Sequence, residues 1–186
     1  MTRVRAQNLS PGELEQLYQH MNWGLFVQAE RDTATVEMAR RVPREEVRSI
    51  ADLSAGGANI TPQIANHFGV TPVLGDLGRQ YGYEISGELS QTLPTIEPVD
   101  LYVCSETIEH LEDPDSDLAL IRSKTRYLVL TTPIAETWPV SHGHLWTWER
   151  PDVEAMIDAS GFKTVDYEGV VLLDDGRYFF GVWLCN

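Results

Sequence analysis

Apolar residues recur at helical spacing near the start of the chain. A helix is predicted to begin at residues 10–13, where a serine suited to N-capping is followed by a proline and, three residues after the serine, by a glutamate. Leu14 and Leu17 continue one apolar face of this helix. A second amphipathic segment runs from about residue 23 to residue 42, and Pro43 ends it. We therefore expect the N-terminal quarter of the chain to be helical.

From residue 47 onward the pattern changes to short apolar runs separated by turns and helical segments. Such runs are typical of buried strands in a mainly parallel sheet, and they span residues 47–53, 70–77, 81–85, 99–104 and 127–131. Helical segments are expected at residues 60–67, 114–124 and 151–159. The alternation of the two kinds of segment predicts an α/β fold.

The C-terminal end of the chain predicts a hairpin. The apolar runs 164–173 and 178–184 flank an Asp-Asp-Gly turn at residues 174–176. An Asp-Gly turn between β-branched and aromatic residues favours antiparallel neighbours. The full expectation is a Rossmann-like, doubly wound, mainly parallel seven-stranded sheet with an antiparallel C-terminal hairpin and N-terminal helices.

The length of 186 residues fits one globular domain, and no shift in composition marks an internal boundary. Within residues 1–186 we expect a helical cap segment at residues 1–46 and a Rossmann-like core at residues 47–186. No apolar run reaches the length of a membrane span, and the chain opens on polar residues, so a cytoplasmic location is expected. Cys104 and Cys185 each lie in an apolar run, which predicts buried free thiols.

The acidic balance of the chain limits its partners. A formal net charge of −14 and a pI near 4.6 produce a field that repels polyphosphate. Nucleic acid is therefore an unlikely partner by charge, and a small-molecule or sugar ligand is easier to accommodate. No membrane partner is expected.

Three of the predicted strands end in residues that carry chemistry, and ligands of parallel sheets bind at the carboxyl ends of strands. The first run ends at Asp52 and leads into a small-residue loop at residues 54–58, whose backbone can approach a ligand closely. Asp76 ends the next run, and an acid there can accept both hydroxyls of a ribose. The run 99–104 delivers Glu106 to the same edge of the sheet.

Residues 106–110 read Glu-Thr-Ile-Glu-His, and a His-Gly-His sequence follows at residues 142–144. In a helical turn Glu106, Glu109 and His110 would point into one small volume. Carboxylate oxygens suit Mg²⁺ or Mn²⁺, whereas imidazole shifts the preference toward Mn²⁺, Fe²⁺, Co²⁺ or Zn²⁺. The spacing therefore predicts a site for a divalent metal; the alternative interpretation is a solvated helix face.

From residue 50 to the C-terminus the sequence resembles the class I S-adenosylmethionine-dependent methyltransferases. The resemblance rests on the loop after Asp52, the acid at Asp76, the run 99–110 with the Asp-Pro-Asp that follows, the run 128–133 and the C-terminal hairpin. It implies S-adenosyl-L-methionine as cofactor, bound by Asp52, Ser54, Gly56 and Gly57 at the methionine end, Asp76 at the ribose, Glu88 and Leu89 near the adenine with Ser86 as a competitor, and Leu77 and Ser105 as further contacts. This chain departs from the family at Ser54 and Ala58, where the family usually has glycine.

Within that superfamily, the glutamates and histidine of residues 106–110 with a later histidine resemble two metal-dependent groups. These are the small-RNA 3′-terminal 2′-O-methyltransferases and the ubiquinone-biosynthesis O-methyltransferases. The resemblance implies a divalent metal held by Glu106, Glu109, His110 and either His142 or His144. Catalytic roles are expected for His110, His144 and Glu106; without a metal, His110 or His144 would serve as general base.

The expected function is S-adenosylmethionine-dependent O-methylation of a small-molecule or sugar hydroxyl, assisted by a divalent metal. One alternative acceptor is the terminal ribose of an RNA or nucleotide. A second alternative is a non-catalytic, methyltransferase-like subunit that binds a partner protein, which the irregular loop at residues 54–58 favours.

Overall fold

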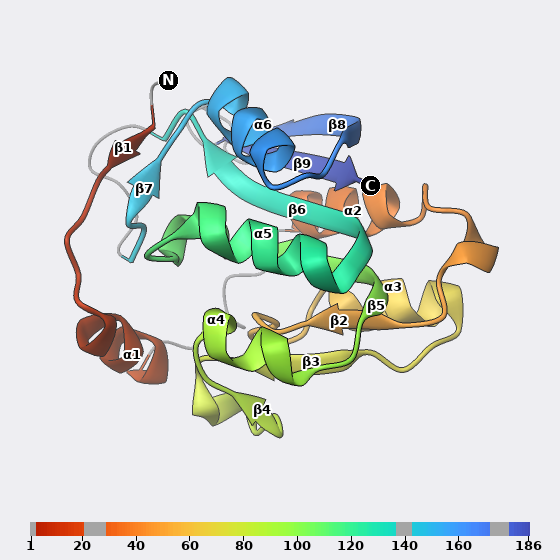
Figure 1. The fold of residues 1–186 in the computed structure, drawn as a ribbon, viewed down its shortest axis with the longest axis horizontal. Helices are drawn as coiled ribbons and strands as arrows, with labels where there is room; N and C mark the ends of the chain where they lie inside the picture. The colour runs from red at the N-terminus through yellow and green to blue at the C-terminus, as the bar shows by residue number, and fades with distance from the viewer. Residues whose placement is uncertain (1–2, 21–28, 137–142, 172–178) are drawn as a thin grey trace.

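The computed structural model describes residues 3–20, 29–136, 143–171 and 179–186 (Figure 1). Its strands are β1 (Val4–Arg5), β2 (Ile50–Asp52), β3 (Val73–Asp76), β4 (Ile85–Ser86), β5 (Val99–Ser105), β6 (Thr125–Ile134), β7 (Trp146–Thr147), β8 (Thr164–Val171) and β9 (Phe179–Cys185). Its α-helices are α1 (Pro11–His20), α2 (Ala29–Ala39), α3 (Thr61–Phe68), α4 (Leu89–Thr92), α5 (Pro114–Lys124) and α6 (Arg150–Ala159). Short 3₁₀ turns are η2 (Arg44–Glu46), η3 (Arg79–Tyr81), η4 (Leu93–Thr95) and η5 (Ile108–His110).

The main sheet has seven strands in the order β4-β3-β2-β5-β6-β9-β8. The strands from β4 to β6 are parallel, whereas β9 runs antiparallel to both β6 and β8. The chain moves outward from β2 to β4 and then returns to place β5 on the other side of β2. The predicted fold class is confirmed, and the strand order reverses between β2 and β5, where open α/β sheets bind their ligands.

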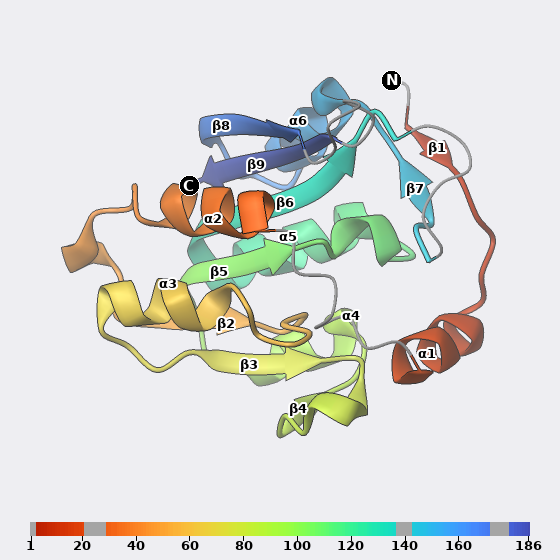
Figure 2. The ribbon, with the colours of Figure 1, turned by 180° about the vertical axis from the view of Figure 1, so that it is seen from behind.

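Helices cover both faces of this sheet. α4, α5 and α6 lie on the face toward the viewer in Figure 1, and α2 and α3 lie on the opposite face, seen in Figure 2. β5 is apolar almost throughout because its alternate side chains enter two different cores. Leu101 and Val103 pack with α2 and α3, whereas Tyr102 and Cys104 pack with α5 and α6. Burial on both faces makes β5 the central strand and leaves its carboxyl end to present polar groups.

Local signals set the helix ends. Asp113 caps α5 through its side chain, which accepts the N–H of Ser116 at 3.1 Å. α6 begins at a reciprocal capping box between Glu149 and Asp152. α3 ends at Gly69, whose φ of 74° is the left-handed conformation that closes a helix.

Several predicted boundaries differ from the structure. The strand predicted at residues 81–85 is instead η3 followed by the two-residue β4, and the left-handed Gly82 between them breaks the extended run. The strand predicted at residues 47–53 is shorter, and β6 is longer than residues 127–131 because it continues directly from α5. The expected start of the second helix and the 174–176 turn lie outside the described residues.

A two-stranded sheet was not predicted. β1 pairs antiparallel with β7. β1 lies in the N-terminal quarter of the chain, which was expected to be helical. The guanidinium carbons (Cζ) of Arg3 and Arg5 lie over the Trp146 ring, 4.1 and 5.2 Å from its centroid. Contacts from two residues that are two positions apart favour an extended backbone here. Figure 2 shows that this pair and α1 lie beyond the carboxyl ends of the parallel strands, so the N-terminal segment borders the same edge as the strand exits.

The sequence also predicted that both cysteines would be buried. Cys104 and Cys185 are buried free thiols, as predicted. None of the helices in the described part of the chain is long and apolar enough to cross a membrane.

Changing Gly181 to alanine is expected to destabilise the protein by about 3 kcal/mol, the upper part of the range for overpacked cores. A Cβ at Gly181 would lie 2.0 Å from the ring of Trp183, which is fully buried two residues further along β9. The ring therefore has to leave its position. Urea unfolding measures the loss, with Gly12→Ala as control, because no atom lies within 4 Å of a Cβ at Gly12. Equal stability of the two variants would contradict this packing.

Candidate active site at the strand exits

The first part of the site is the exit of β2. Asp52 is buried; its Oδ1 accepts the N–H of Ser54 at 3.0 Å and its Oδ2 accepts the hydroxyl of Thr61 at 2.5 Å. Burial raises the pKa of Asp52 to about 6, although these hydrogen bonds favour the ionised form. Asp52 therefore ties the end of β2 to the start of α3 and shapes the loop between them.

Asp76 holds the same loop from the neighbouring strand. Its Oδ2 accepts the N–H of Gly56 at 2.8 Å, and its Oδ1 accepts the N–H of Gly78 at 2.7 Å. The second bond is the turn role that an aspartate before a glycine suggests. Gly56 has a φ of 50°, and a Cβ built on it would meet no atom of the described residues within 4 Å. The backbone at Gly56 is therefore open to a ligand on the side where its Cβ would lie.

The two departures from the family's glycine pattern have different structural consequences. Ala58 adopts a φ of 54°, a left-handed conformation that a glycine would adopt without strain. The Ser54 hydroxyl lies 3.3 Å from Oδ1 of Asp52 and accepts the Thr107 hydroxyl at 2.7 Å. Ser54 thus connects the loop after β2 to the turn after β5.

The residues expected near the adenine lie at or just after the carboxyl ends of β3 and β4. Gly87 donates its N–H to the carbonyl of Asp76 at 3.2 Å, which brings the end of β4 beside β3. Around this point Leu77 is half-buried, Leu89 is buried, and Ser86 and Glu88 are exposed. Gly57 is exposed within the loop after β2.

The exit of β5 does not form the helical turn that the spacing of residues 106–110 suggested. Glu106 takes a φ of 52°, and only then does the chain enter the 3₁₀ turn η5. The strained backbone turns Glu106 away from Glu109 and His110. Ser105, the last residue of β5, bonds instead to Thr131 of β6 with 2.8 Å between their hydroxyl oxygens.

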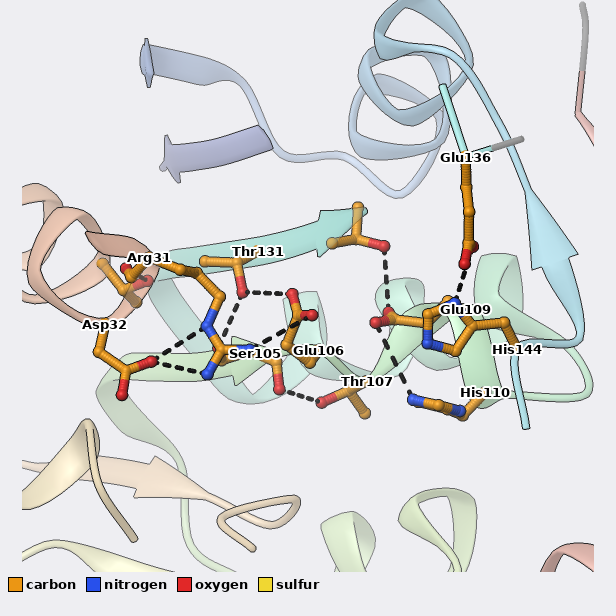
Figure 3. A network of polar contacts seen from close by, with 12 residues as sticks. Arg31, Asp32, Ser105, Glu106, Thr107, Glu109, His110, Thr131, Glu136 and His144 are labelled. Atoms are coloured by element: carbon orange, nitrogen blue, oxygen red, sulfur yellow. Dashed lines mark hydrogen bonds and ion pairs between the residues drawn. The ribbon is translucent and has the colours of Figure 1, made fainter. Parts of the chain in front are cut away.

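Arg31 of α2 faces Glu106. Its Nη1 lies 3.3 Å from Oε2 of Glu106, and its Nη2 lies 2.6 Å from Oδ1 of Asp32 (Figure 3). Burial disfavours the charge of Arg31, but the facing carboxylates outweigh it and raise its pKa. Burial raises the pKa of Glu106 to about 7 even though the charge of Arg31 lowers it. Glu106 is therefore a carboxyl group that titrates near neutral pH.

Glu109, His110 and His144 form a compact group. One ligand atom from each lies within 4.8 Å of the others, and this is a metal-type cluster found among the described residues. Oε2 of Glu109 accepts the Thr132 hydroxyl at 3.0 Å. Its Oε1 is buried without a hydrogen-bond partner among the described residues and lies 3.9 Å from Nε2 of His110. Burial, together with the charge of Glu106, raises the pKa of Glu109 well above its usual range.

Both imidazoles are oriented through Nδ1. His110 directs Nδ1 at the carbonyl of Gly143 at 2.9 Å, and His144 directs Nδ1 at Oε2 of Glu136 at 2.8 Å. The two rings meet edge to face, with 4.8 Å between their centroids. Burial and the neighbouring His144 lower the pKa of His110 to about 3, so its ring stays neutral. Gly143 has a φ of 95°, which explains the glycine of the His-Gly-His sequence.

The structure thus brings together the predicted residues Asp52, Ser54, Gly56 and Asp76 in one half, and Glu109, His110 and His144 in the other. Glu106 borders the second half but belongs to the Arg31 ion pair rather than to the three-residue group. His142 lies outside the described residues.

Four polar residues of the site were missed by sequence reasoning: Arg31, Thr107, Thr132 and Glu136. Arg31 is a basic residue near the start of a predicted amphipathic helix, and nothing local distinguishes it from a surface arginine. Thr132 had a detectable signal, because Thr131-Thr132 interrupts the apolar run of β6 near its exit. Glu136 lies in a connection without periodicity, and only the fold brings it to His144.

Comparisons with known proteins give a likeness in fold but none in sequence. No protein-family model and no curated protein matches the sequence. Among solved structures, the 1,6-didemethyltoxoflavin-N1-methyltransferase of Burkholderia thailandensis, with bound 1,6-didemethyltoxoflavin and S-adenosylhomocysteine, is 15% identical with a TM-score of 0.71, covering 99% of this chain and 95% of that one. An S-adenosylmethionine-dependent methyltransferase of Leishmania major is 14% identical with a TM-score of 0.73, covering 94% and 82% respectively.

A third solved structure, the cyclase SpnF, is 12% identical with a TM-score of 0.65, covering 83% of this chain and 79% of its own. SpnF is a [4+2]-cyclase, and cyclisation differs from methyl transfer, so the shared fold does not by itself determine the reaction. The strand order and these likenesses agree in one respect: the chain has the class I S-adenosylmethionine-dependent methyltransferase fold.

Proposed function

We propose that this protein is an S-adenosylmethionine-dependent methyltransferase that methylates a hydroxyl of a small molecule or sugar with the help of a divalent metal ion. The observation that carries the proposal is the 2.7 Å hydrogen bond from Thr107 to Ser54. It joins the loop after β2 to the turn that bears Glu109 and His110. Methyl transfer needs donor and acceptor held in line at one place, and two adjoining half-sites meet that need.

The first half-site fits the cofactor. Asp52, Ser54, Gly56 and Gly57 would line its methionine end, and Asp76 would accept ribose hydroxyls. Each oxygen of Asp76 takes one backbone N–H, and a carboxylate oxygen has a second lone pair to offer. The open space beside Gly56 supports close approach of a ligand to the backbone. The bound cofactor supplies an activated methyl group, so the chain has to bind, orient and exclude water.

The residues expected beside the adenine extend this half-site. Leu89 and Leu77 would contribute apolar contacts, and Glu88 or Ser86 a polar one. Ser105 would border the cofactor at the exit of β5. Each of these roles is a proposal that follows from the position of the residue at a strand exit.

The second half-site fits a metal ion. Glu109, His110 and His144 would hold it, since a carboxylate oxygen and two imidazole nitrogens lie within 4.8 Å of one another. The unpartnered Oε1 of Glu109 supports this fit, because a buried carboxylate oxygen without a partner is costly. When bound, a divalent cation lowers the pKa of an acceptor hydroxyl and can hold two adjacent hydroxyls.

Glu106 would receive the proton of the acceptor hydroxyl. Its pKa of about 7 matches the requirement that a general base titrate near the working pH. His110 suits that role less, because a group whose pKa is about 3 is a weak base at neutral pH. Arg31 would hold the Glu106 side chain in place through the ion pair described above.

Within a single domain of residues 1–186, the predicted cap segment 1–46 divides into two parts: α2 packs on the sheet as a core helix, and the part with β1 and α1 would act as the cap. A Cβ built on Gly143 would lie 3.1 Å from Cδ2 of Leu17 in α1 and 3.5 Å from Nδ1 of His110. α1 therefore packs directly against the backbone that orients His110. This contact supports a role for the cap in excluding water from the acceptor.

Two measurements test the proposal. Calorimetric titration with S-adenosylmethionine is expected to show saturable binding, and a panel of diols and sugars is expected to reveal methyl transfer that falls when a chelator is added. Full activity in chelator would remove the metal from the proposal. Absence of binding at millimolar cofactor would overturn the proposal and favour the non-catalytic alternative, which the substitutions at Ser54 and Ala58 support.

A nucleotide or RNA terminal ribose is a second candidate acceptor, because it also presents adjacent hydroxyls. The net charge of −14 opposes it. Binding at two salt concentrations separates the two acceptors, since an enzyme that reads phosphates must lose affinity steeply as salt rises.

A further inference from the structure

Glu136 is a buried carboxylate that no step above uses. It follows β6, and its side chain is 5% exposed, as little as the His144 side chain it contacts, which is 8% exposed. Its Oε2 lies 2.8 Å from Nδ1 of His144, and Figure 3 shows the side chain extending from the end of β6 to that ring. Burying a carboxylate is costly unless a partner compensates it, so this position calls for a function or a strong contact.

The backbone before Glu136 is arranged to make this contact. Ala135 adopts a φ of 54°, and its N–H donates to the carbonyl of Trp148 at 2.9 Å. A left-handed conformation is strained for alanine, and such strain persists only where the surroundings enforce it. The turn after β6 places the Glu136 side chain beside His144. Glu106 and Ala135 are thus two strained residues, one just after β5 and one just after β6. Both border the group formed by Glu109, His110 and His144.

The contact determines which nitrogen of His144 is available. A carboxylate accepts hydrogen bonds, so Nδ1 of His144 carries the proton and Nε2 presents its lone pair. The same holds for His110, whose Nδ1 meets the carbonyl of Gly143. Two independent acceptors therefore select the same tautomer in two rings that touch each other. Histidines that bind metals almost always donate their other ring N–H to a carboxylate or a carbonyl.

We propose that Glu136 is a positioning residue that fixes the tautomer and orientation of His144, so that Glu109, His110 and His144 are preorganised for a transition-metal ion rather than for Mg²⁺. The proposal rests on the proposed function, of which it specifies the metal class. Two imidazoles and one carboxylate suit Mn²⁺, Fe²⁺, Co²⁺ or Zn²⁺, whereas Mg²⁺ prefers oxygen ligands and retains its water.

The test compares the wild type with Glu136→Leu, Glu136→Gln and His144→Ala, using Co²⁺ and Mg²⁺ as probes. Calorimetry measures affinity, and the visible absorption of bound Co²⁺ reports its ligands. Glu136→Leu is expected to weaken Co²⁺ binding by about 10- to 100-fold, the usual cost of losing an outer partner of a ligand. Its Co²⁺ spectrum should approach that of His144→Ala. Glu136→Gln should lose less, because an amide oxygen still accepts the Nδ1 proton.

A matched control is His67→Asn, which removes a histidine of α3 outside the site and should leave Co²⁺ affinity unchanged. If Glu136→Leu binds Co²⁺ with the affinity and spectrum of the wild type, the positioning role is wrong while the metal proposal stands. If the wild type binds Mg²⁺ as tightly as Co²⁺, the proposed metal class is wrong. If it binds S-adenosylmethionine but neither ion, the metal part of the proposed function fails as well. Should thermal melting show that Glu136→Leu does not fold, Glu136→Gln decides the question by its affinity and spectrum.

Discussion

Glu109→Gln is expected to weaken binding of a divalent transition metal by more than about 100-fold, because even an outer partner of a ligand is worth about 10- to 100-fold. The substitution keeps the shape of the side chain and its acceptor for Thr132, but it removes the charge that a metal would neutralise. Methyl transfer to adjacent hydroxyls should fall with metal affinity. Calorimetry with Mn²⁺ and a transfer assay on the same preparation measure both effects.

The same substitution is expected to stabilise the metal-free protein at mildly alkaline pH by about 1–3 kcal/mol, because an ionised carboxyl group is costlier to bury than a neutral amide. Glu109 is 1% exposed, and burial raises its pKa. The folded state therefore binds its proton more tightly than the unfolded state does, so the wild type loses stability as pH rises through the raised pKa. Glutamine has no such loss, and the difference should vanish in acid, where the carboxyl is protonated in both states.

Urea unfolding in chelator at acidic and at mildly alkaline pH measures this difference. Glu46→Gln is the control, because Glu46 pairs with Arg126 at 2.6 Å outside the site and accepts the hydroxyl of Tyr127. That variant should lose stability slightly and keep its metal affinity. A destabilised Glu109→Gln protein with normal metal binding would show that Glu109 is a structural residue only.

Asp76→Asn is expected to lower the affinity for S-adenosylmethionine by about 10- to 100-fold, since hydrogen bonds to a charged group contribute about 1.5–3 kcal/mol. An asparagine has one acceptor oxygen where Asp76 uses two, so either Gly56 or Gly78 loses its partner. The loop after β2 then loses its bond to the Asp76 side chain, although the N–H of Ala55 still donates to the carbonyl of Gly75, or the ribose loses its acceptor. Calorimetric titration with S-adenosylhomocysteine measures the affinity without turnover.

Asp100→Asn is a closely matched control. Asp100 also caps backbone N–H groups, those of Arg48 and Ser49 at 2.7 and 3.0 Å, but it does so near the start of β5, at the opposite edge of the sheet. Asp100 accepts both N–H groups through Oδ2, so asparagine at this position keeps an acceptor for both and loses only the charge. Only Asp76→Asn should lose cofactor affinity. Equal affinities in the two variants would rule out the assignment of Asp76 to the cofactor.

The sequence predicted the sheet well because burial on both faces leaves a clear record. β5 is an apolar run without alternation, and the hairpin was predicted from an Asp-Gly sequence between apolar, β-branched and aromatic residues, so both followed from residue type. β4 was misplaced because a two-residue strand carries almost no periodic signal, and β1 was missed for the same reason.

The candidate site could be located but not assembled from the sequence. The exits of parallel strands share one edge, which is why Asp52, Asp76 and Glu106 could be placed near one another. The backbone conformation of Glu106 could not be foreseen, because a φ of 52° is uncommon for a glutamate. The contacts of Arg31 and Glu136 are set by tertiary packing across more than one element, and no local pattern encodes them.

The hydroxyl bridge between Ser54 and Thr107 makes the two half-sites mechanically continuous. If both half-sites bind as proposed, a ligand that shifts either loop is expected to change the free energy of the other, so occupancy at one position would alter affinity at its neighbour. Such heterotropic linkage is reciprocal: the factor by which the first ligand strengthens or weakens the second equals the factor in the opposite direction. In a chain that retained glycine at this position, that particular route of communication would not exist.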